Sequence, residues 1–296
     1  MTRRLLFVHA HPDDESSKGA ATAARLVDEG AQVVLVTCTG GEAGDLLNPH
    51  ADPVEPGQIA AVRARELADA VAVIGFTRTH HLGHVDSGYH EDPADVPQGT
   101  FSRLDPDVPG AQFARILREE RPHVVVTYPE DGGYPHPDHV MTHTITMRAL
   151  AIAEDPAADV PGAPWRVAKV YAPMMHAVER LDALIDAMVA AGREGEYTAR
   201  MRERREGREH LDPDARILVA DHLDRRDAAL RAHVTQVDPT GPWFEVPRDL
   251  ERAHYPYEAY ELLRSDVDVE VPEEDLFAGI DVDAWDAATL PVQARR

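Results

Sequence analysis

The amino-terminal part of the chain constrains the fold most, because it alternates apolar runs with one helical segment. Leu5–Val8 predicts a buried strand, and Ser17–Glu29 predicts a helix with small residues on its packing face. Gly30 follows at a position where glycine commonly ends a helix, and Gln32–Thr37 predicts a second buried strand. Residues 4–38 therefore predict a β-α-β unit, in which the strands are parallel and the crossover is right-handed.

The same alternation continues downstream and indicates an α/β fold. We expect a Rossmann-like, mainly parallel sheet with helices on both faces, followed by a carboxy-terminal extension. Residues 90–110, which are rich in Pro, Asp and Gly, predict an irregular excursion over the site. Further strands are predicted at Thr79–Leu82, His123–Tyr128 and Val167–Tyr171, and further helices at Gln58–Gly75, Gly110–Glu120, Asp138–Ala153, Glu179–Gly192 and residues 220–235.

We interpret residues 1–296 as a single domain. Residues 1–195 would form the sheet-containing core, and residues 196–296 would form the extension packed against it. The dense charge run Glu194–Arg208, where that extension begins, is typical of a solvated helix or loop. Pro239–Trp243 predicts a turn.

The charge balance excludes some classes of partner. With 30 basic and 53 acidic residues, the chain has a formal charge of −23, which repels nucleic-acid phosphates and anionic lipid. No segment approaches the roughly 18 apolar residues of a membrane span, and the apolar run after Met1 is too short for a signal peptide. The single cysteine, Cys38, excludes an internal disulfide framework. We therefore expect a cytoplasmic protein that binds neither nucleic acid nor membrane.

Two clusters of histidine and carboxylate residues each follow a predicted strand. They read His9-Ala10-His11-Pro12-Asp13-Asp14-Glu15 and Tyr134-Pro135-His136-Pro137-Asp138-His139. In open α/β sheets, ligands bind beyond the carboxyl ends of the strands, where both clusters would lie. His11 and Asp14 can converge from one tight turn, and His139 can add a third ligand from the first turn of its helix. This set predicts a catalytic site for one Zn2+ per chain, and Fe2+ also suits these ligands.

The sequence also permits two other interpretations of the clusters. His136, His139 and His143 share the start of one helix and could hold a metal alone, but that leaves the paired aspartates unexplained. The first cluster could instead be a turn in which Asp14 or Ser16 caps the following helix. We interpret His9 as a structural residue or a neighbour of the metal ligands, and His143 as a packing residue or a neighbour of the metal ligands.

The residues beside the expected ligands suit general acid–base chemistry. Asp13 adjoins Asp14 but points elsewhere, so its carboxylate can take a proton from the attacking water. A protonated His136 could stabilise an oxyanion, with Asp138 holding its imidazolium by a hydrogen bond. The chain has no Gly-x-Ser-x-Gly elbow, no Gly-x-Gly-x-x-Gly after the first strand and no P-loop. Metal-assisted hydrolysis is therefore favoured over serine-nucleophile, dinucleotide and nucleotide chemistry.

The pairing of His11-Pro12-Asp13-Asp14-Glu15 with His136-Pro137-Asp138-His139 resembles the LmbE-like family of zinc-dependent N-acyl-sugar deacetylases and amidases. Within that family, the chain is most similar to the branch that hydrolyses mycothiol S-conjugates. The resemblance covers nearly the whole chain. The segments that carry it are Ser16–Thr22, Leu47–Pro49, Val85–Gly88, Gly132–His139, Arg231–Pro239 and Asp275–Gly279.

This resemblance implies roles for the residues around the metal and the scissile bond. It makes His11, Asp14 and His139 the zinc ligands. It makes Asp13 the base and His136 the electrostatic acid. The implied fold is the Rossmann-like sheet expected above.

On the substrate side, the resemblance gives Tyr134 a contact with the carbonyl and Lys18 a contact with the substrate. Arg63 and Asp86 would hold glucosamine hydroxyls. The expected partner is a small thiol–sugar conjugate. The implied reaction cleaves the amide between an S-substituted N-acetylcysteine and glucosaminyl-inositol.

Other substrates and one other class of function stay open. The chain could deacetylate N-acetylglucosaminyl-inositol or another N-acetyl sugar. It could also cleave a mycothiol adduct in antibiotic biosynthesis, because Lys169–His176 and Ala43 depart from the amidase pattern on the side that recognises the thiol conjugate. A non-catalytic sugar-binding or metal-storage protein is disfavoured by the presence of Asp13 and His136, because a binder needs no base beside the metal. The sequence does not fix the oligomeric state.

Overall fold

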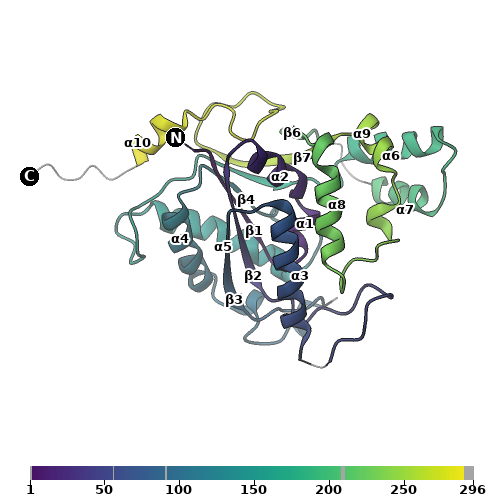
Figure 1. The fold of residues 1–296 in the computed structure, drawn as a ribbon. Coiled ribbons are helices and arrows are strands. Elements are labelled where there is room, and N and C mark those ends of the chain that lie inside the picture. The colour runs from purple at the N-terminus through teal and green to yellow at the C-terminus, as the bar shows by residue number, and fades with distance from the viewer. Residues whose placement is uncertain (1, 56, 91, 208–210, 290–296) are drawn as a thin grey trace, which may run out of the picture.

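A seven-stranded sheet runs through the computed structural model, which describes residues 2–55, 57–90, 92–207 and 211–289 (Figure 1). The strand order is β3-β2-β1-β4-β5-β7-β6. β1 to β5 are parallel, whereas β7 is antiparallel to both of its neighbours, β5 and β6. The bounds are β1 Arg4–His9, β2 Gln32–Thr39, β3 Arg78–His84, β4 Val124–Val126, β5 Lys169–Pro173, β6 Ala215–Leu218 and β7 Tyr257–Ser265.

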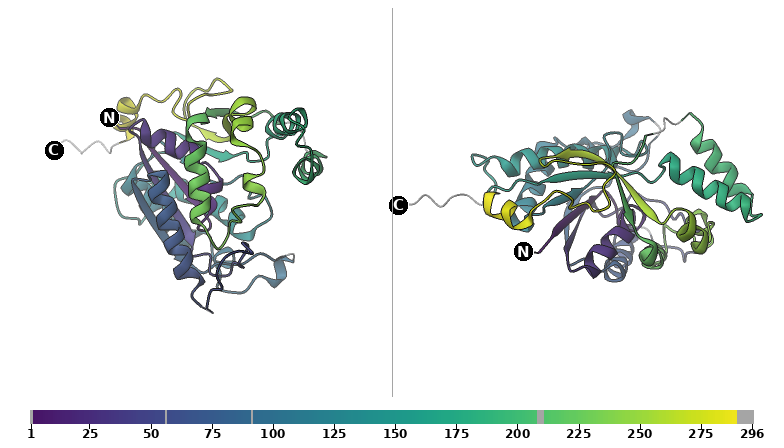
Figure 2. Two further views of the ribbon diagram at one scale, coloured as in Figure 1. Left: turned by 45° about the vertical axis from the view of Figure 1, so that its right-hand side comes forward. Right: turned by 90° about the horizontal axis from the view of Figure 1, so that it is seen from above.

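Helices cover both faces of this sheet (Figure 2). α2, α3 and α8 pack on one face, and α4 and α5 pack on the other. The α-helices are α1 Asp14–Ser17, α2 Ala20–Asp28, α3 Ile59–Ile74, α4 Asp107–Glu120, α5 Pro137–Glu154, α6 Val178–Ala190, α7 Glu196–Arg205, α8 Leu223–Ala232, α9 Arg248–His254 and α10 Val282–Thr289. Short 3-10 turns are η1 Pro93–Asp95, η2 Phe101–Arg103, η3 Ala220–His222 and η4 Pro242–Phe244.

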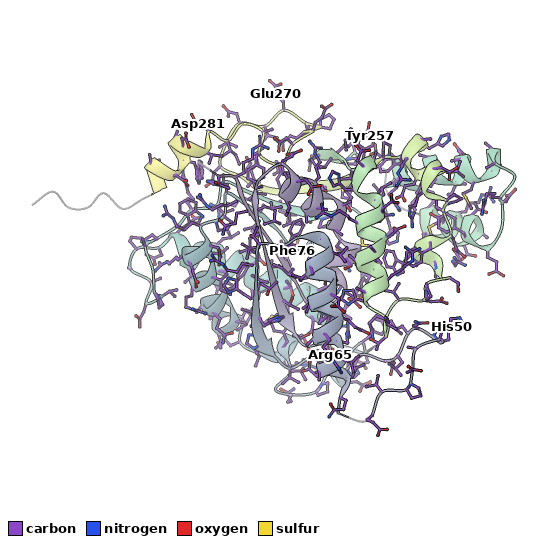
Figure 3. All side chains as sticks on the ribbon, viewed as in Figure 1. His50, Arg65, Phe76, Tyr257, Glu270 and Asp281 are labelled. Carbon is purple, nitrogen blue, oxygen red and sulfur yellow. The ribbon has the colours of Figure 1, made fainter. Side chains whose placement is uncertain are left out.

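The residues of β1 alternate between these two helical layers. Leu5 and Phe7 belong to the apolar cluster with α2, α3 and α8, whereas Leu6 and Val8 belong to the cluster with α4 and α5. Figure 3 shows Phe76 in the interior, where its ring meets that of Phe7 edge-on. Because both faces are covered, the middle of each central strand is a continuous apolar run, Leu5–Val8 in β1, Val33–Val36 in β2 and Val124–Val126 in β4. The predicted α/β fold with a mainly parallel sheet is confirmed.

The helix predicted over Ser17–Glu29 is two helices, α1 and α2, with a break at Lys18 and Gly19. Gly19 has a φ of 103°, and a Cβ at this position would lie 2.6 Å from Cε1 of Phe7. Glycine is therefore required where the chain turns over β1. The break separates the first histidine–carboxylate cluster from the packing helix.

The carboxy-terminal residues contribute strands, which the sequence did not predict. β7 pairs with β5 and with β6, so the segment expected to pack on the core extends the sheet itself. Glu258 of β7 also accepts hydrogen bonds from the backbone N–H groups of Ala21 and Thr22, which caps the start of α2. On β5, the buried Lys169 forms an ion pair with Glu273. The division of the domain at residue 195 stays a prediction.

A helical lobe of α6, α7 and α9 lies on the side of the molecule away from α10 (Figure 1). It has its own small apolar cluster, which includes Leu184 and Met201. α7 occupies most of the predicted charge run Glu194–Arg208, whose last residue lies outside the described residues. Within the part of the chain that the structure describes, no helix has both the length and the apolar character needed to cross a membrane.

The close contact at Gly19 gives a test of this packing. Gly19→Ala should lower the free energy of unfolding by about 2–4 kcal/mol, because it combines a disfavoured positive φ with overpacking against Phe7. Gly30→Ala is the matched control, since Gly30 also has a positive φ but no atom within 4 Å of an added Cβ. It should cost only about 1 kcal/mol. Equal losses for the two variants in urea denaturation would contradict this account.

Candidate metal centre and active site

The two histidine–carboxylate clusters meet at one edge of the sheet. β1 and β4 are neighbours, with Leu5 opposite Val124, and each strand delivers its cluster from its carboxyl end. The ring centroid of His11 lies 4.5 Å from that of His136 and 5.5 Å from that of His139. The predicted meeting of the clusters is therefore what the structure shows.

His139 presents a free ring nitrogen to this cluster. Its Nδ1–H donates a hydrogen bond to the carbonyl of Gly132 at 3.1 Å, which leaves the lone pair on Nε2. Nε2 is buried and has no hydrogen-bond partner among the described residues. At Gly132, a Cβ would lie 2.8 Å from the Cβ of His139, so glycine permits this contact. A buried, unpartnered imidazole nitrogen beside carboxylates fits a divalent metal.

Asp14 lies between the two histidines. Its Oδ2 is 3.4 Å from Nδ1 of His11 and 3.4 Å from Nε2 of His139, and it accepts a hydrogen bond from the hydroxyl of Tyr128 at 2.6 Å. Nζ of Lys18 is 2.5 Å from its Oδ1. Burial opposes the ionisation of Asp14, but Lys18 and the histidines outweigh it and hold the pKa of Asp14 well below its usual value. Asp14 is therefore an anion at the centre of the cluster.

The other side of His11 also faces carboxylates. Its Nε2 lies 3.3 Å from Oδ2 of Asp138 and 3.4 Å from Oδ1 of Asp86. Burial acts to lower the pKa of His11, but hydrogen bonds to Asp138, Asp14 and Asp86 raise it well above its usual value. Each ring nitrogen of His11 thus has a carboxylate beside it.

Backbone groups hold Asp86 and Asp138 in place. Asp86 accepts hydrogen bonds from the N–H groups of Ala43 at 3.1 Å and Gly88 at 2.9 Å. Asp138 accepts one from the N–H of Ser87 at 3.0 Å, while its Oδ1 has no partner among the described residues. Asp86, predicted to contact glucosamine hydroxyls, is only 4% exposed and lies against His11.

Two compact groups of described residues could each hold a metal ion, because one ligand atom from each member lies within 4.8 Å of the others. They are His11 with His136 and His139, and His11 with Asp86 and Asp138. The predicted set, in which Asp14 joins His11 and His139, shares both histidines with the first group. His143 belongs to neither group. Its Nδ1 contacts the carbonyl of Tyr128 at 2.8 Å.

Asp13 adopts a backbone conformation that is rare for a residue with a side chain, with a φ of 117° and a ψ of −26°. Its carboxylate remains 27% exposed and lies 3.1 Å from a guanidinium nitrogen of Arg63. Burial raises the pKa of Asp13, Arg63 opposes that rise, and the neighbouring Asp14 adds to it. An accessible carboxylate with a raised pKa suits a general base.

Two residues predicted to contact substrate are engaged with the protein. The ammonium of Lys18 binds Asp14. Arg63 is 3% exposed, and its guanidinium donates hydrogen bonds to the carbonyls of Gly41 at 2.8 Å and Pro12 at 2.5 Å. Arg63 thus ties together the loops that follow β1 and β2. Contacts of Lys18 and Arg63 with a substrate stay predictions.

His136 is uncharged in this site. Burial lowers the pKa of His136 to about 3, and His11 and His139 add to the effect. Its Nδ1 accepts the backbone N–H of Asp138 at 3.2 Å, so Nε2 carries the proton. The Asp138 carboxylate contacts His11 at 3.3 Å, and its predicted role in holding His136 stays a prediction. Tyr134, 47% exposed, stands over the rings of His136 and His139.

Tyr128 is a site residue that sequence reasoning missed. Its hydroxyl accepts the N–H of Ala10 at 3.0 Å and donates to Asp14, while its ring stacks on His139. Its place two residues after β4, at the same sheet edge as the clusters, was the available signal. The edge of its ring also meets His9, whose pKa burial lowers to about 4. The ring of His9 is enclosed, and its role, structural or beside the metal ligands, stays a prediction.

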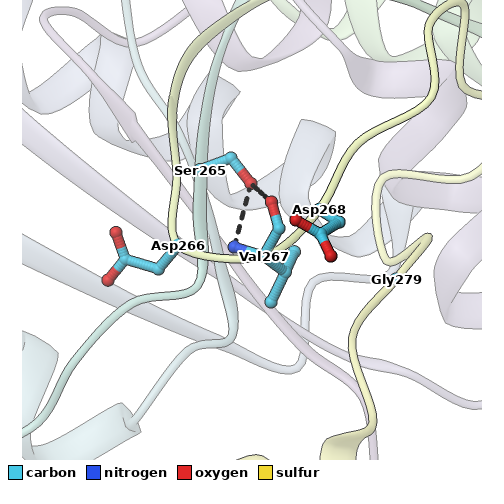
Figure 4. A pocket seen from close by; sticks show the side chains of 5 residues that line it. All are labelled: Ser265, Asp266, Val267, Asp268 and Gly279. Carbon is cyan, nitrogen blue, oxygen red and sulfur yellow. Dashed lines mark hydrogen bonds between the residues drawn. The ribbon is translucent and has the colours of Figure 1, made fainter.

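A separate surface depression lies near the amino end of β5, on the side of the sheet away from the two clusters. Figure 4 shows the side chains that line it. Its volume is about 600 Å³, and it is lined by Ser265, Asp266, Val267, Asp268 and Gly279. Ser265 pairs with Lys169, which begins β5, so the depression is remote from the carboxyl ends of the parallel strands. The hydroxyl of Ser265 is bonded to the backbone of Val267. We therefore place the chemistry at the histidine–carboxylate clusters.

Comparison with known proteins agrees with this geometry. The family model for PIG-L, a GlcNAc-PI de-N-acetylase, matches residues 6–150, which contain both clusters. A mycothiol S-conjugate amidase of Streptomyces coelicolor is 44% identical over 286 residues, covering 94% of this chain and 97% of that protein. A 1D-myo-inositol 2-acetamido-2-deoxy-alpha-D-glucopyranoside deacetylase of Geodermatophilus obscurus is 40% identical over 299 residues, covering 94% and 98%.

Among solved structures, the conserved protein TT1542 of Thermus thermophilus shares the fold, with a TM-score of 0.59 and 21% identity over 92% of this chain and 98% of that one. The chain belongs to the PIG-L or LmbE-like deacetylase family. It is a metal-dependent amidohydrolase of that family. The predicted resemblance is thereby confirmed.

The strained turn at Asp13 can be tested by stability alone. Asp13→Gly and Asp13→Ala both remove the carboxylate, but only glycine accepts a φ of 117° without steric cost. Asp13→Gly should therefore be more stable than Asp13→Ala by about 1 kcal/mol, after allowance for the greater freedom of glycine in the unfolded chain. The midpoints of urea denaturation measure this difference. A more stable alanine variant would show that the turn is not strained.

Proposed function

We propose that this protein hydrolyses the amide bond of mycothiol S-conjugates with the help of zinc. The products would be an N-acetylcysteine S-conjugate and glucosaminyl-inositol. The observation that carries the reaction type is the unpartnered Nε2 of His139, which lies 3.4 Å from the Asp14 carboxylate. The partly exposed carboxylate of Asp13 directly precedes Asp14 in the chain. The similarity to the S. coelicolor amidase along 94% of the chain supports the choice of substrate.

We assign His11, Asp14 and His139 as the zinc ligands. A third ligand from His136 is less suitable, because its Nε2 carries the proton in the tautomer that the backbone N–H of Asp138 selects. Asp138 sits on the far ring nitrogen of His11 and would fix that ring, as carboxylates commonly do for ligand histidines. Zinc bound to this set would polarise the amide carbonyl and lower the pKa of a water molecule.

The chain's own groups supply the proton transfers. Asp13 takes a proton from the attacking water, and Arg63 keeps its carboxylate oriented while it does so. Nε2–H of His136 donates a hydrogen bond to the developing oxyanion, which needs a donor and not a positive charge. Tyr134 assists at the carbonyl from the exposed side of the site. Asp13, once it has taken the proton from water, would return that proton to the leaving amine.

A deacetylase function is the second candidate. The G. obscurus deacetylase matches 94% of this chain at 40% identity, only slightly below the amidase. Both reactions hydrolyse an amide on the amino group of a sugar, so the same metal ligands and base would serve. The two functions differ in the acyl group that must be accommodated.

The ligand assignment predicts metal content. Zinc-loaded wild type should contain about one ion per chain, while Asp14→Ala and His139→Ala should lose most of it because each removes one of three ligands. His136→Ala and the control Tyr134→Phe should keep the ion. Elemental analysis after gel filtration measures this. Loss of zinc from His136→Ala with retention in Asp14→Ala would assign the metal to the three histidines instead.

The substrate assignment predicts a rate ratio. Zinc-loaded protein should cleave a bimane–mycothiol conjugate with a kcat/KM more than about tenfold that for acetate release from N-acetylglucosaminyl-inositol. Asp13→Ala should keep its zinc, but its kcat/KM on either compound should fall by about 10²–10⁴-fold, because it lacks the base. Chromatography of the released acid and amine measures both. Faster release of acetate would favour the deacetylase.

A further inference from the structure

Glu15 is a buried carboxylate that the reaction above does not use. It is 1% exposed, and its Oε1 accepts hydrogen bonds from Nε2–H of His233 and from the hydroxyl of Ser16, both at 2.6 Å. Its Oε2 accepts the backbone N–H of Asp13 at 2.9 Å. Oε2 of Glu15 therefore binds the backbone of Asp13, the proposed base, and Oε1 is held by His233, which lies far along the chain from the first cluster.

The peptide bond between Pro12 and Asp13 is clamped on both sides. The carbonyl of Pro12 accepts a hydrogen bond from Arg63 at 2.5 Å, and the N–H of Asp13 donates to Glu15. Together these contacts fix the peptide plane from which the Asp13 side chain projects. A φ of 117° is costly for aspartate and persists only where the surroundings determine it. The direction of the Asp13 carboxylate therefore depends on the clamp.

His233 is a rigid anchor for one side of this clamp. It follows α8 directly, is fully buried, and its carbonyl accepts the N–H of Gln236 at 3.0 Å. Nearby, Glu66 of α3 binds both the N–H and the hydroxyl of Thr235, at 2.8 Å and 2.7 Å. The imidazole thus comes from a fixed segment 218 residues along the chain from Glu15.

We propose that Glu15 and His233 are a positioning pair for Asp13. His233 orients the Glu15 carboxylate, Glu15 holds the strained N–H of Asp13, and the Asp13 carboxylate is thereby directed at the attacking water. Neither residue touches substrate. The proposal rests on the role of Asp13 as base proposed above, but not on which amide is cleaved.

The test uses zinc-loaded protein with whichever of the two amides the wild type hydrolyses. His233→Ala should lower kcat about tenfold to a hundredfold, because a small misplacement of a reacting group has effects of that size. KM should stay within about threefold and zinc content should be unchanged. His233→Gln, whose amide can still donate to Glu15, should recover most of kcat. The matched control is His222→Ala. This variant also removes a contact between a histidine and a carboxylate of the amino-terminal half, because His222 contacts Asp28 at the surface. It should keep the kcat of the wild type.

A double-mutant cycle separates positioning from general destabilisation. In an Asp13→Ala background, His233→Ala should cause no further loss of kcat, because the group that it positions is gone. The same fractional loss in both backgrounds, or full kcat in folded His233→Ala, would overturn the proposal. If His233→Ala does not fold, His233→Asn replaces it, since its amide is too short to reach Glu15. Equal kcat for the Asn and Gln variants would then overturn the proposal.

A crystal structure of the His233 variant provides a readout that does not depend on activity. The backbone of Asp13 should leave the positive-φ region when the Glu15 carboxylate is released. An unchanged φ at Asp13 would contradict the proposal, whether or not the wild type hydrolyses either amide. A wild type that hydrolyses neither amide would count against the proposed function alone.

Discussion

The parallel pairing of β1 with β4 is the constraint on which the rest of the site depends. The two strands lie side by side, so the turn after β1 and the start of α5 meet although they are far apart in the chain. The register is set by burial, because Leu5 must face one helical layer and Leu6 the other. A slip by one residue would exchange these faces. It would also move His11 away from His139, so the core determines the site geometry.

The site also concentrates negative charge in the interior, which explains several of its features. Asp14, Asp86 and Asp138 are each at most 4% exposed and all lie beside His11. Buried carboxylates cost several kcal/mol each unless they are paired. Each accepts at least one backbone N–H group, which does not neutralise its charge, and the ammonium of Lys18 binds Asp14. A divalent cation would balance the remaining charge, so the donor set fits a metal on electrostatic grounds as well as by ligand type.

Sequence patterns could predict whatever depends on local order. The apolar runs located β1, β2 and β4, and the motifs after β1 and β4 located the clusters, because parallel strands share one ligand-binding edge. β6 and β7 escaped prediction, since β7 is mostly half-buried without a regular alternation and its pairing is set by distant strands. The contact of the Asp138 carboxylate with His11 and that of the Tyr128 hydroxyl with Asp14 join residues more than 100 positions apart, which no local spacing encodes.

The carboxy-terminal residues therefore extend the sheet and also contact the turn that carries Asp13. The family model ends at residue 150, after both clusters, yet the turn that holds Asp13 is supported by His233 and the loop after β2 is tied to the segment after α8. In that segment the carbonyl of Thr235 accepts the N–H groups of Leu47 and Asn48. The proposed metal ligands and base thus come from the amino-terminal half, while contacts to the turn that carries Asp13 and to the loop after β2 come from the other half. Relatives that keep the motifs but differ after residue 150 would hold the same groups in different orientations, which is a physical route to different acyl groups on one scaffold.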